Sequence, residues 1–345
     1  MTARFAGLRR ALLAMIVLVM MLAGAVAASA LWWLERPLAL REATVELSIE
    51  PGTAPRDIAQ GWVDGGVQTS PRLIYEWFRW SGQARKIRAG SYEVGAGITP
   101  RRLLDMMVRG DETLATVRLI EGWTFRQFRA ELARAEALKA TTAGMSDADI
   151  MSALGAPGVA AEGRFYPDTY AYSKGSADMA LLRRAFHAMQ TRLAAAWQQR
   201  TVDTPLRNAD EALTLASIIE KETGALADRG RVGGVFVNRL RLGMLLQTDP
   251  TVIYGLGERF DGNLRKRDLL TDSPFNTYTR GGLPPTPISM PGKASLQVAV
   301  RPDFTAALYF VARGDGTSEF SVTLAEHNRA VDKYQRGKKP ADRSP

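Results

Sequence analysis

The feature that most constrains this chain is an uninterrupted apolar segment near its start. Residues 11–34 (ALLAMIVLVMMLAGAVAASALWWL) contain no ionisable side chain. At 1.5 Å per residue, a helix over this segment would extend about 36 Å, enough to cross the hydrocarbon core of a bilayer with some tilt. Three arginines precede it, the last being Arg10, and they favour a cytoplasmic location for residues 1–10.

A cleaved signal peptide is the competing interpretation of the same segment. Residues 28–30 (ASA) have the small-residue pattern of a cleavage site. However, the apolar run is longer than the core of a usual signal peptide, and it continues into Trp32 and Trp33, which suit a membrane–water interface. We therefore favour a single-pass anchor in the inner membrane, with the remaining chain in the periplasm. Both interpretations place that remainder outside the cytoplasm, which argues against a nucleic-acid partner.

Composition limits the kinds of site that the chain can hold. The 345 residues include no cysteine and two histidines, so we expect no disulfide, no metal site and no cofactor. The net charge of +9 suits an anionic lipid surface or a polymer that carries carboxylates. One basic, solubilising face would give the same composition.

Behind the apolar segment, the sequence predicts a small α+β domain over residues 43–112. Alternating side chains predict strands near 43–49 and 89–94, and helices with one apolar side lie between and after them. Pro100 opens the last of these helices, and Gly110 ends it. The strand–helix–helix–strand order resembles a LysM module, a fold associated with glycan binding.

A larger mixed α/β domain is predicted over residues 113–335, and residues 336–345 are expected to form a frayed tail. The fold class is therefore α+β, with an N-terminal transmembrane helix. Ser146 and Thr323 each begin a capping motif that marks the start of a helix. Residues 245–291 are rich in Thr, Asn, Asp, Gly and Pro with little periodicity, a composition uncommon in a compact domain unless the segment is functional.

Glu220 is the residue most suited to acid–base chemistry. It ends an apolar helical segment, and the small residues Ser217 and Gly224 lie near it, so a ligand has room to approach. Apolar surroundings disfavour the carboxylate and raise its pKa toward the range of a general acid, although a surface glutamate is the competing interpretation. Glu222 lies about 200° further round the helix, so the two carboxyl groups do not face one bond as a glycosidase pair would.

Several segments together resemble one known family. In chain order they are GRFYPDTY (163–170), ASIIEKET (216–223), VFVNRL (235–240), LQTDPTVIYG (246–255), and NTY (276–278) followed by GLPP (282–285). As a set they are similar to the endolytic murein transglycosylase family, also called the MltG or YceG-like family. Each fragment alone would be a weak signal, but the set is specific, and the similarity covers nearly the whole chain.

The resemblance implies a lyase that cleaves the MurNAc–GlcNAc bond within peptidoglycan strands and leaves 1,6-anhydro-MurNAc ends, which would limit the length of nascent strands. It also implies that Glu220 is the catalytic acid/base. One carboxyl group suffices for this chemistry, because the nucleophile, the C6 hydroxyl, already belongs to the substrate. The implied partners are glycan strands, the membrane, and the cell-wall synthases.

Other residues of these segments are expected to bind substrate. Hydrogen bonds to sugar hydroxyls and stacking on sugar rings are the expected roles of Gln247, Thr248, Asp249, Asn238, Asn276, Tyr254 and Tyr278. Two of these residues have an alternative role. Asp249 could instead form a turn around Pro250, and Asn238 could instead be a buried structural amide.

Two other functions remain open on the sequence. The first is a membrane-anchored protein that binds peptidoglycan without catalysis, which the basic charge and the LysM-like domain would suit. The second is a muramidase that hydrolyses the same bond, with Asp168 or Asp249 as the partner carboxylate. Product mass distinguishes them, because an anhydro product is lighter by one water than a hydrolytic product.

Overall fold

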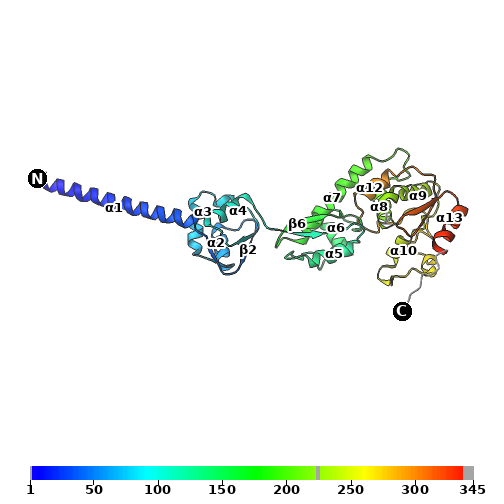
Figure 1. Cartoon of the computed structure of the whole chain (residues 1–345), viewed down its shortest axis with the longest axis horizontal. Helices are drawn as coiled ribbons and strands as arrows, with labels where there is room; N and C mark the ends of the chain where they lie inside the picture. Colours follow the sequence, from blue (N-terminus) through cyan, green and yellow to red (C-terminus); the bar gives the residue numbers. More distant parts are fainter. Residues whose placement is uncertain (1, 223–225, 337–345) are drawn as a thin grey trace. The chain divides into compact units, whose positions relative to one another are not determined.

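The computed structural model describes residues 2–222 and 226–336. The predicted tail, residues 336–345, lies outside these described residues except for Arg336. The chain divides into two compact units, which are treated separately below (Figure 1). Their bounds are Met1–Ala115 with Tyr172–Gly175, and Thr116–Ala171 with Ser176–Pro345.

The predicted apolar segment is helical throughout. It lies within α1 (Thr2–Glu35), which continues unbroken through the alternative cleavage site. Within the described part of the chain, α1 holds the one stretch long and apolar enough to cross a membrane, Met15–Glu35, with a mean hydropathy of 2.3. A membrane anchor and a signal sequence both fit such a helix. At its end, Arg101 donates to the Glu35 carboxylate at 2.6 Å, which fastens α1 to the rest of the first unit.

The first unit is built around one antiparallel pair of strands. Strand β2 (Thr44–Ile49) pairs with β4 (Gly90–Gly95) along its full length. Its other elements are β1 (Ala39–Leu40), α2 (Pro55–Asp64), β3 (Val67–Gln68), α3 (Pro71–Trp80) and α4 (Pro100–Arg109). Trp62 lies at the centre of the core and is fully buried. The mixed α/β character agrees with the sequence prediction, whereas the short strand β3 interrupts the predicted order strand–helix–helix–strand between α2 and α3. The likeness to a LysM module stays a prediction.

Local sequence determines where α4 begins and ends. The Thr99 side chain accepts a hydrogen bond from the backbone of Arg102, and Pro100 occupies the first turn, where its missing N–H costs nothing. Gly110 ends the helix in the left-handed region at φ 78°. The predicted start of this helix at Pro100 and its predicted end at Gly110 are both confirmed.

The second unit contains the remaining elements, except that the first two residues of β5 and the last two of β6 belong to the first unit. Strands β5 (Leu114–Arg118) and β6 (Thr169–Ser173) pair with each other, as do β7 (Tyr309–Ala312) and β8 (Ser318–Ser321). Over the described ranges, the α-helices of this unit are α5 (Phe125–Arg134), α6 (Asp147–Ala153), α7 (Asp178–Gln198), α8 (Ala209–Glu222), α9 (Arg229–Arg241), α10 (Asp249–Leu256), α11 (Lys266–Leu270), α12 (Lys293–Val300) and α13 (Leu324–Val331).

Helix α8 is the central element of this unit. It packs against α7, α9, α10 and α12 (Figure 1). Every residue from Ala212 to Ile219 is buried, which explains why the sequence is apolar around most of the helix. Such a helix is enclosed by its neighbours, and its last described residues, 220–222, emerge among the segments that follow.

Candidate active site at the end of helix α8

Glu222, the last described residue of α8, lines a cavity of about 460 Å³. We call it the Glu222 cavity. Arg239, Gln247, Asp249 and Tyr278 also line it, together with residues of β7, β8 and α13. Three of the predicted substrate-binding residues therefore meet here, around a glutamate.

The segment that carries these residues is held by buried threonines. The Thr248 backbone donates to the Thr277 hydroxyl at 3.1 Å, and the hydroxyls of Thr251 and Thr277 lie 2.9 Å apart. Gln247 adopts the left-handed region at φ 50°, which is uncommon for a residue other than glycine and often marks a functional position. This bracing fixes where Gln247 and Asp249 meet the cavity.

Burial controls the protonation of Glu222. Loss of solvent raises the pKa of this carboxyl, and the nearby charge of Asp249 raises it further. Thr248 opposes both effects, because its Oγ1 donates to Glu222 Oε2 at 2.7 Å and favours the anion. The result is a carboxyl group that holds its proton to higher pH than an ordinary glutamate, as a general acid requires.

Asp249 and Tyr278 form a second polar pair in the cavity. The Tyr278 hydroxyl donates to Asp249 Oδ1 at 2.6 Å. Burial, followed by this bond and the charge of Asp249, raises the pKa of Tyr278, so the phenol stays protonated. Arg239 supplies a nearby guanidinium, fixed by hydrogen bonds to the backbone carbonyls of Leu308 and Leu246.

Glu220 lies on a different side of the helix from this cavity, and it is not among the residues that line it. Its Oε2 accepts a hydrogen bond from the Gly292 backbone at 2.9 Å. Its Oε1 is 3.6 Å from Arg229 Nη2, and the side chain is only 6% exposed. Glu220 therefore does not face the Glu222 cavity, because two residues of helix turn it away from the side of α8 that Glu222 occupies. The prediction that the two glutamates do not face one bond agrees with this arrangement.

Glu121 is a second acid beside Glu220, and the sequence alone did not predict it. Burial and the negative charge of Glu220 raise the pKa of Glu121, whereas Arg229 lowers it. A Cβ atom added to Gly292 would lie 1.8 Å from Glu121 Oε1, so this carboxyl rests directly against the glycine backbone. Nothing in the local sequence at Glu121 signals this contact, because it joins segments far apart in the chain.

The other predicted binding residues have structural partners. Asn238 donates to the carbonyls of Thr305 and Ala307 at 2.8 and 3.2 Å, which favours the structural amide that was the alternative interpretation. Asn276 is fully buried, and its amide donates to three backbone carbonyls, including Thr271 at 2.7 Å. Tyr254 lines a different cavity. Asn238 and Asn276 therefore hold backbone segments in place, and Tyr254 belongs to another site.

His327 is a further lining residue that the sequence did not mark. It stacks on Tyr309 with ring centroids 5.2 Å apart. Among the described residues, its buried Nδ1 atom has no hydrogen-bond partner, and burial lowers the pKa of the imidazole. His327 thus lines the Glu222 cavity, while its Nδ1 atom is buried in the protein. Within the described ranges, no group of three or more His, Cys, Asp and Glu side chains could hold a metal ion.

Comparisons with known proteins agree with this architecture. A crystal structure of a YceG-like protein from Listeria monocytogenes is 28% identical, with a TM-score of 0.52, and the match covers 83% of this chain and 98% of that one. The endolytic murein transglycosylase of Bacillus subtilis (strain 168) is 39% identical over 173 residues, and its namesake in Streptococcus pneumoniae (serotype 2, strain D39) is 29% identical over 182 residues.

These two relatives are matched over only part of their length. The aligned region spans 50% and 51% of this chain, but 48% and 33% of the relatives. The profile of the YceG-like family, in contrast, matches residues 47–333, which is most of the sequence. The chain therefore belongs to the YceG-like family.

Proposed function

We propose that this protein is an endolytic murein lytic transglycosylase. It cleaves the MurNAc–GlcNAc bond within glycan strands and leaves 1,6-anhydro-MurNAc ends, thereby limiting strand length. The observation that carries the proposal is the carboxyl group of Glu222, whose pKa is raised by burial at the wall of a polar cavity. Relatives named for the same activity support it.

Glu222 takes the role that the sequence had given to Glu220. The protonated Glu222 carboxyl gives its proton to the glycosidic oxygen as the bond to C1 breaks. The resulting carboxylate then accepts the proton of the C6 hydroxyl on the same MurNAc, and the C6 oxygen bonds to C1. No water is consumed, and the acid returns to its starting state. The tethered hydroxyl has a high effective concentration, so one carboxyl group is sufficient.

Neighbouring residues assist this cycle. The Thr248 hydroxyl favours the carboxylate that exists after the first proton transfer. We propose that Gln247 and Asp249 hydrogen-bond sugar hydroxyls and that Tyr278 stacks on a sugar ring; the position of all three in the lining of the Glu222 cavity supports these roles. Asp249 also keeps the muramidase alternative open, since it is a second carboxylate in the same cavity; exposed Asp168 does not line that cavity.

Two isosteric variants test the assignment. In purified full-length protein acting on murein glycan, Glu222→Gln should abolish product, whereas Glu220→Gln should retain cleavage with reduced stability. Products lighter by one water than hydrolytic ends identify the lyase. Glu222→Gln that still releases anhydro-muropeptides contradicts the proposal, and a folded but inactive Glu220→Gln returns the role to Glu220. Asp249→Asn tests hydrolysis, because loss of a water-containing product in this variant would indicate a muramidase.

We also propose the cellular arrangement. Helix α1 anchors the chain in the inner membrane, the LysM-like domain (43–112) binds glycan, and the catalytic domain (113–335) lies in the periplasm near the synthases. The apolar composition of α1 and the basic residues before it support this orientation. Protease added to spheroplasts should degrade both domains and leave the anchor; full protection would contradict it.

A further inference from the structure

A larger cavity lies elsewhere in the second unit. It has a volume of about 1030 Å³ and is bounded by the start of α5, residues 158–162, and α10. We call it the Tyr254 cavity. Neither Glu222 nor Thr248, which donates a hydrogen bond to it, lines this cavity. Its size suits a ligand of several hundred daltons.

The floor of the Tyr254 cavity is polar but carries little charge. Glu162 is 9% exposed, and its Oε1 accepts from the Phe125 backbone at 3.0 Å. Its Oε2 accepts from the Tyr254 hydroxyl at 3.2 Å. Burial raises the pKa of Glu162 to about 7, so near neutral pH this carboxyl is often uncharged. Such a floor favours a neutral ligand with hydroxyl or amide groups over a cation.

The Tyr254 cavity has apolar walls and a charged rim. Pro250, Ile253 and Phe260 supply apolar surface. At the rim, Arg126 pairs with Glu258 at 2.6 Å, and Asp147 pairs with Arg129 at 2.9 Å. The exposed Lys221 adds a cation to the lining. Apolar surface with a few fixed polar groups is the usual lining of a small-molecule or sugar site.

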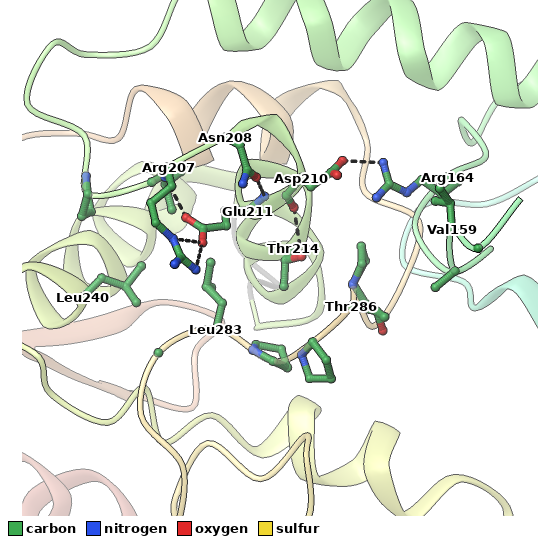
Figure 2. Close-up of a pocket in the computed structure, with 18 residues that line it drawn as sticks. Val159, Arg164, Arg207, Asn208, Asp210, Glu211, Thr214, Leu240, Leu283 and Thr286 are labelled. Atoms are coloured by element: carbon green, nitrogen blue, oxygen red, sulfur yellow. Dashed lines mark hydrogen bonds and ion pairs between the residues drawn. The ribbon is translucent and has the colours of Figure 1, made fainter. Parts of the chain in front are cut away.

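A neighbouring hollow extends the cavity. It has a volume of about 690 Å³ and shares Gly158, Val159, Ala160 and Thr286 with the Tyr254 cavity. Figure 2 shows Val159 and Thr286 on one side of this hollow and Leu240 on the other. Its acids are also paired, since Arg164 contacts Asp210 at 2.6 Å and Arg207 contacts Glu211. The two hollows therefore share part of their lining, and we call them together the elongated groove.

Residues that are adjacent in sequence line the groove and the Glu222 cavity, and we call these residues the ridge. Lys221 lines the Tyr254 cavity, whereas the next residue, Glu222, lines the other. The same alternation occurs at the start of α10, where Pro250 faces the Tyr254 cavity and Asp249 faces the Glu222 cavity. A polymer that crosses this ridge would therefore contact both hollows.

We infer that the elongated groove is a distal binding site for N-acetylated amino sugars of the same glycan strand, several residues away from the bond that is cut. The inference rests on the proposed function and adds to it. A strand held on both sides of the ridge is cut internally, and the length of the groove sets how much strand must lie beyond the cut.

The test measures binding separately from cleavage. Ala160 is exposed and lies where the two hollows meet, so Ala160→Trp should obstruct the groove without disturbing the core. Ala143→Trp is the matched control, because Ala143 is also exposed and lines neither hollow. Each is placed in full-length Glu222→Gln protein in detergent. The probe is murein glycan stripped of its stem peptides, with affinity measured by fluorescence anisotropy.

Ala160→Trp should weaken the affinity for long strands by about tenfold, and Ala143→Trp should leave it unchanged. Tyr254→Phe, which removes the floor hydroxyl, should also weaken binding. Equal affinity of Ala160→Trp and its control overturns the inference, as does binding that requires stem peptides. Because no cleavage occurs in this background, a failure of the proposed lyase activity would appear only in the active protein and is distinguishable from a failure of the groove.

Discussion

The Thr248 Oγ1 atom donates a hydrogen bond of 2.7 Å to Glu222 Oε2, and Thr248 itself is only 2% exposed. The bond joins the last described turn of α8 to the residue before α10. It favours the carboxylate while burial favours the acid, so the pKa of Glu222 reflects two opposed effects. Each can be changed separately.

Thr248→Val should shift the pH dependence of cleavage. Removing the hydroxyl takes away a bond to the anion, so the pKa of Glu222 rises further. The alkaline limb of kcat/KM, which reports the protonated acid, should move up by about one pH unit. Thr248→Ser keeps the hydroxyl and should keep the wild-type profile. A limb that stays in place or moves toward acid in Thr248→Val would show that this bond does not tune the catalytic group.

Arg229→Met should destabilise the second unit because it leaves the Glu220 charge buried without its cation. Arg229 is 8% exposed, and the Glu220 side chain is 6% exposed. Breaking a buried ion pair from one side typically costs about 3 kcal/mol, whereas removing both charges costs much less. Denaturant unfolding of Arg229→Met, Glu220→Gln and the double variant measures this coupling. Additive effects of the two changes would show that the pair does not interact.

Glu162 should make stability depend on pH. Its pKa is raised from 4.5 to about 7 in the folded state, so between these values the folded protein holds a proton that the unfolded chain has released. Stability from this group is full below about pH 4.5 and is lost as pH rises through 7, by about 3 kcal/mol in total. Glu162→Gln, which does not titrate, should gain that amount relative to wild type in unfolding experiments between pH 4.5 and 8. Parallel curves for the two proteins would contradict the shift.

Gly163→Ala should be far more damaging than Gly158→Ala. Both glycines are left-handed, at φ 80° and 78°, so alanine is strained at either position by about 1 kcal/mol. At Gly163 the new Cβ would also lie 2.4 Å from Pro287 Cβ, whereas Gly158 has open space. Because proline is rigid, the clash should bring the total cost to about 3 kcal/mol or more. Thermal unfolding midpoints of the two variants compare them directly, and similar values would mean that residues 286–288 can move aside.

Local patterns predicted much of the fold because local contacts determine it. The capping motifs at Ser146 and Thr323 are both present, with side-chain bonds to the backbone three residues on. The strands β7 and β8 pair around residues 313–317, where Gly314, Asp315 and Gly316 favour a turn. Residues 245–291 showed little periodicity because α10 and α11 are short and are held by neighbours such as Asn276 rather than by an amphipathic pattern.

The site was harder to predict for a physical reason. Helical geometry shows that Glu220 and Glu222 point to different sides, but a helix buried from Ala212 to Ile219 gives no polar face to orient it. The distinction depends on what packs against each side: Arg229 and Gly292 beside one glutamate, Thr248 beside the other. Gln247 and Asp249 could be placed together because they lie in one short segment.

The small group of residues 172–175 belongs to the first unit although the chain has by then already entered the second. Ser173 contacts Glu112, and Lys174 pairs with Glu46 at 2.6 Å. A stop codon after Ala115 would therefore yield a first unit that lacks residues 172–175. A protein that begins at Thr116 would keep these four residues but lack the unit that they pack against. Gene-level dissection of the two units requires circular permutation or a graft of this loop, because no single cut separates them.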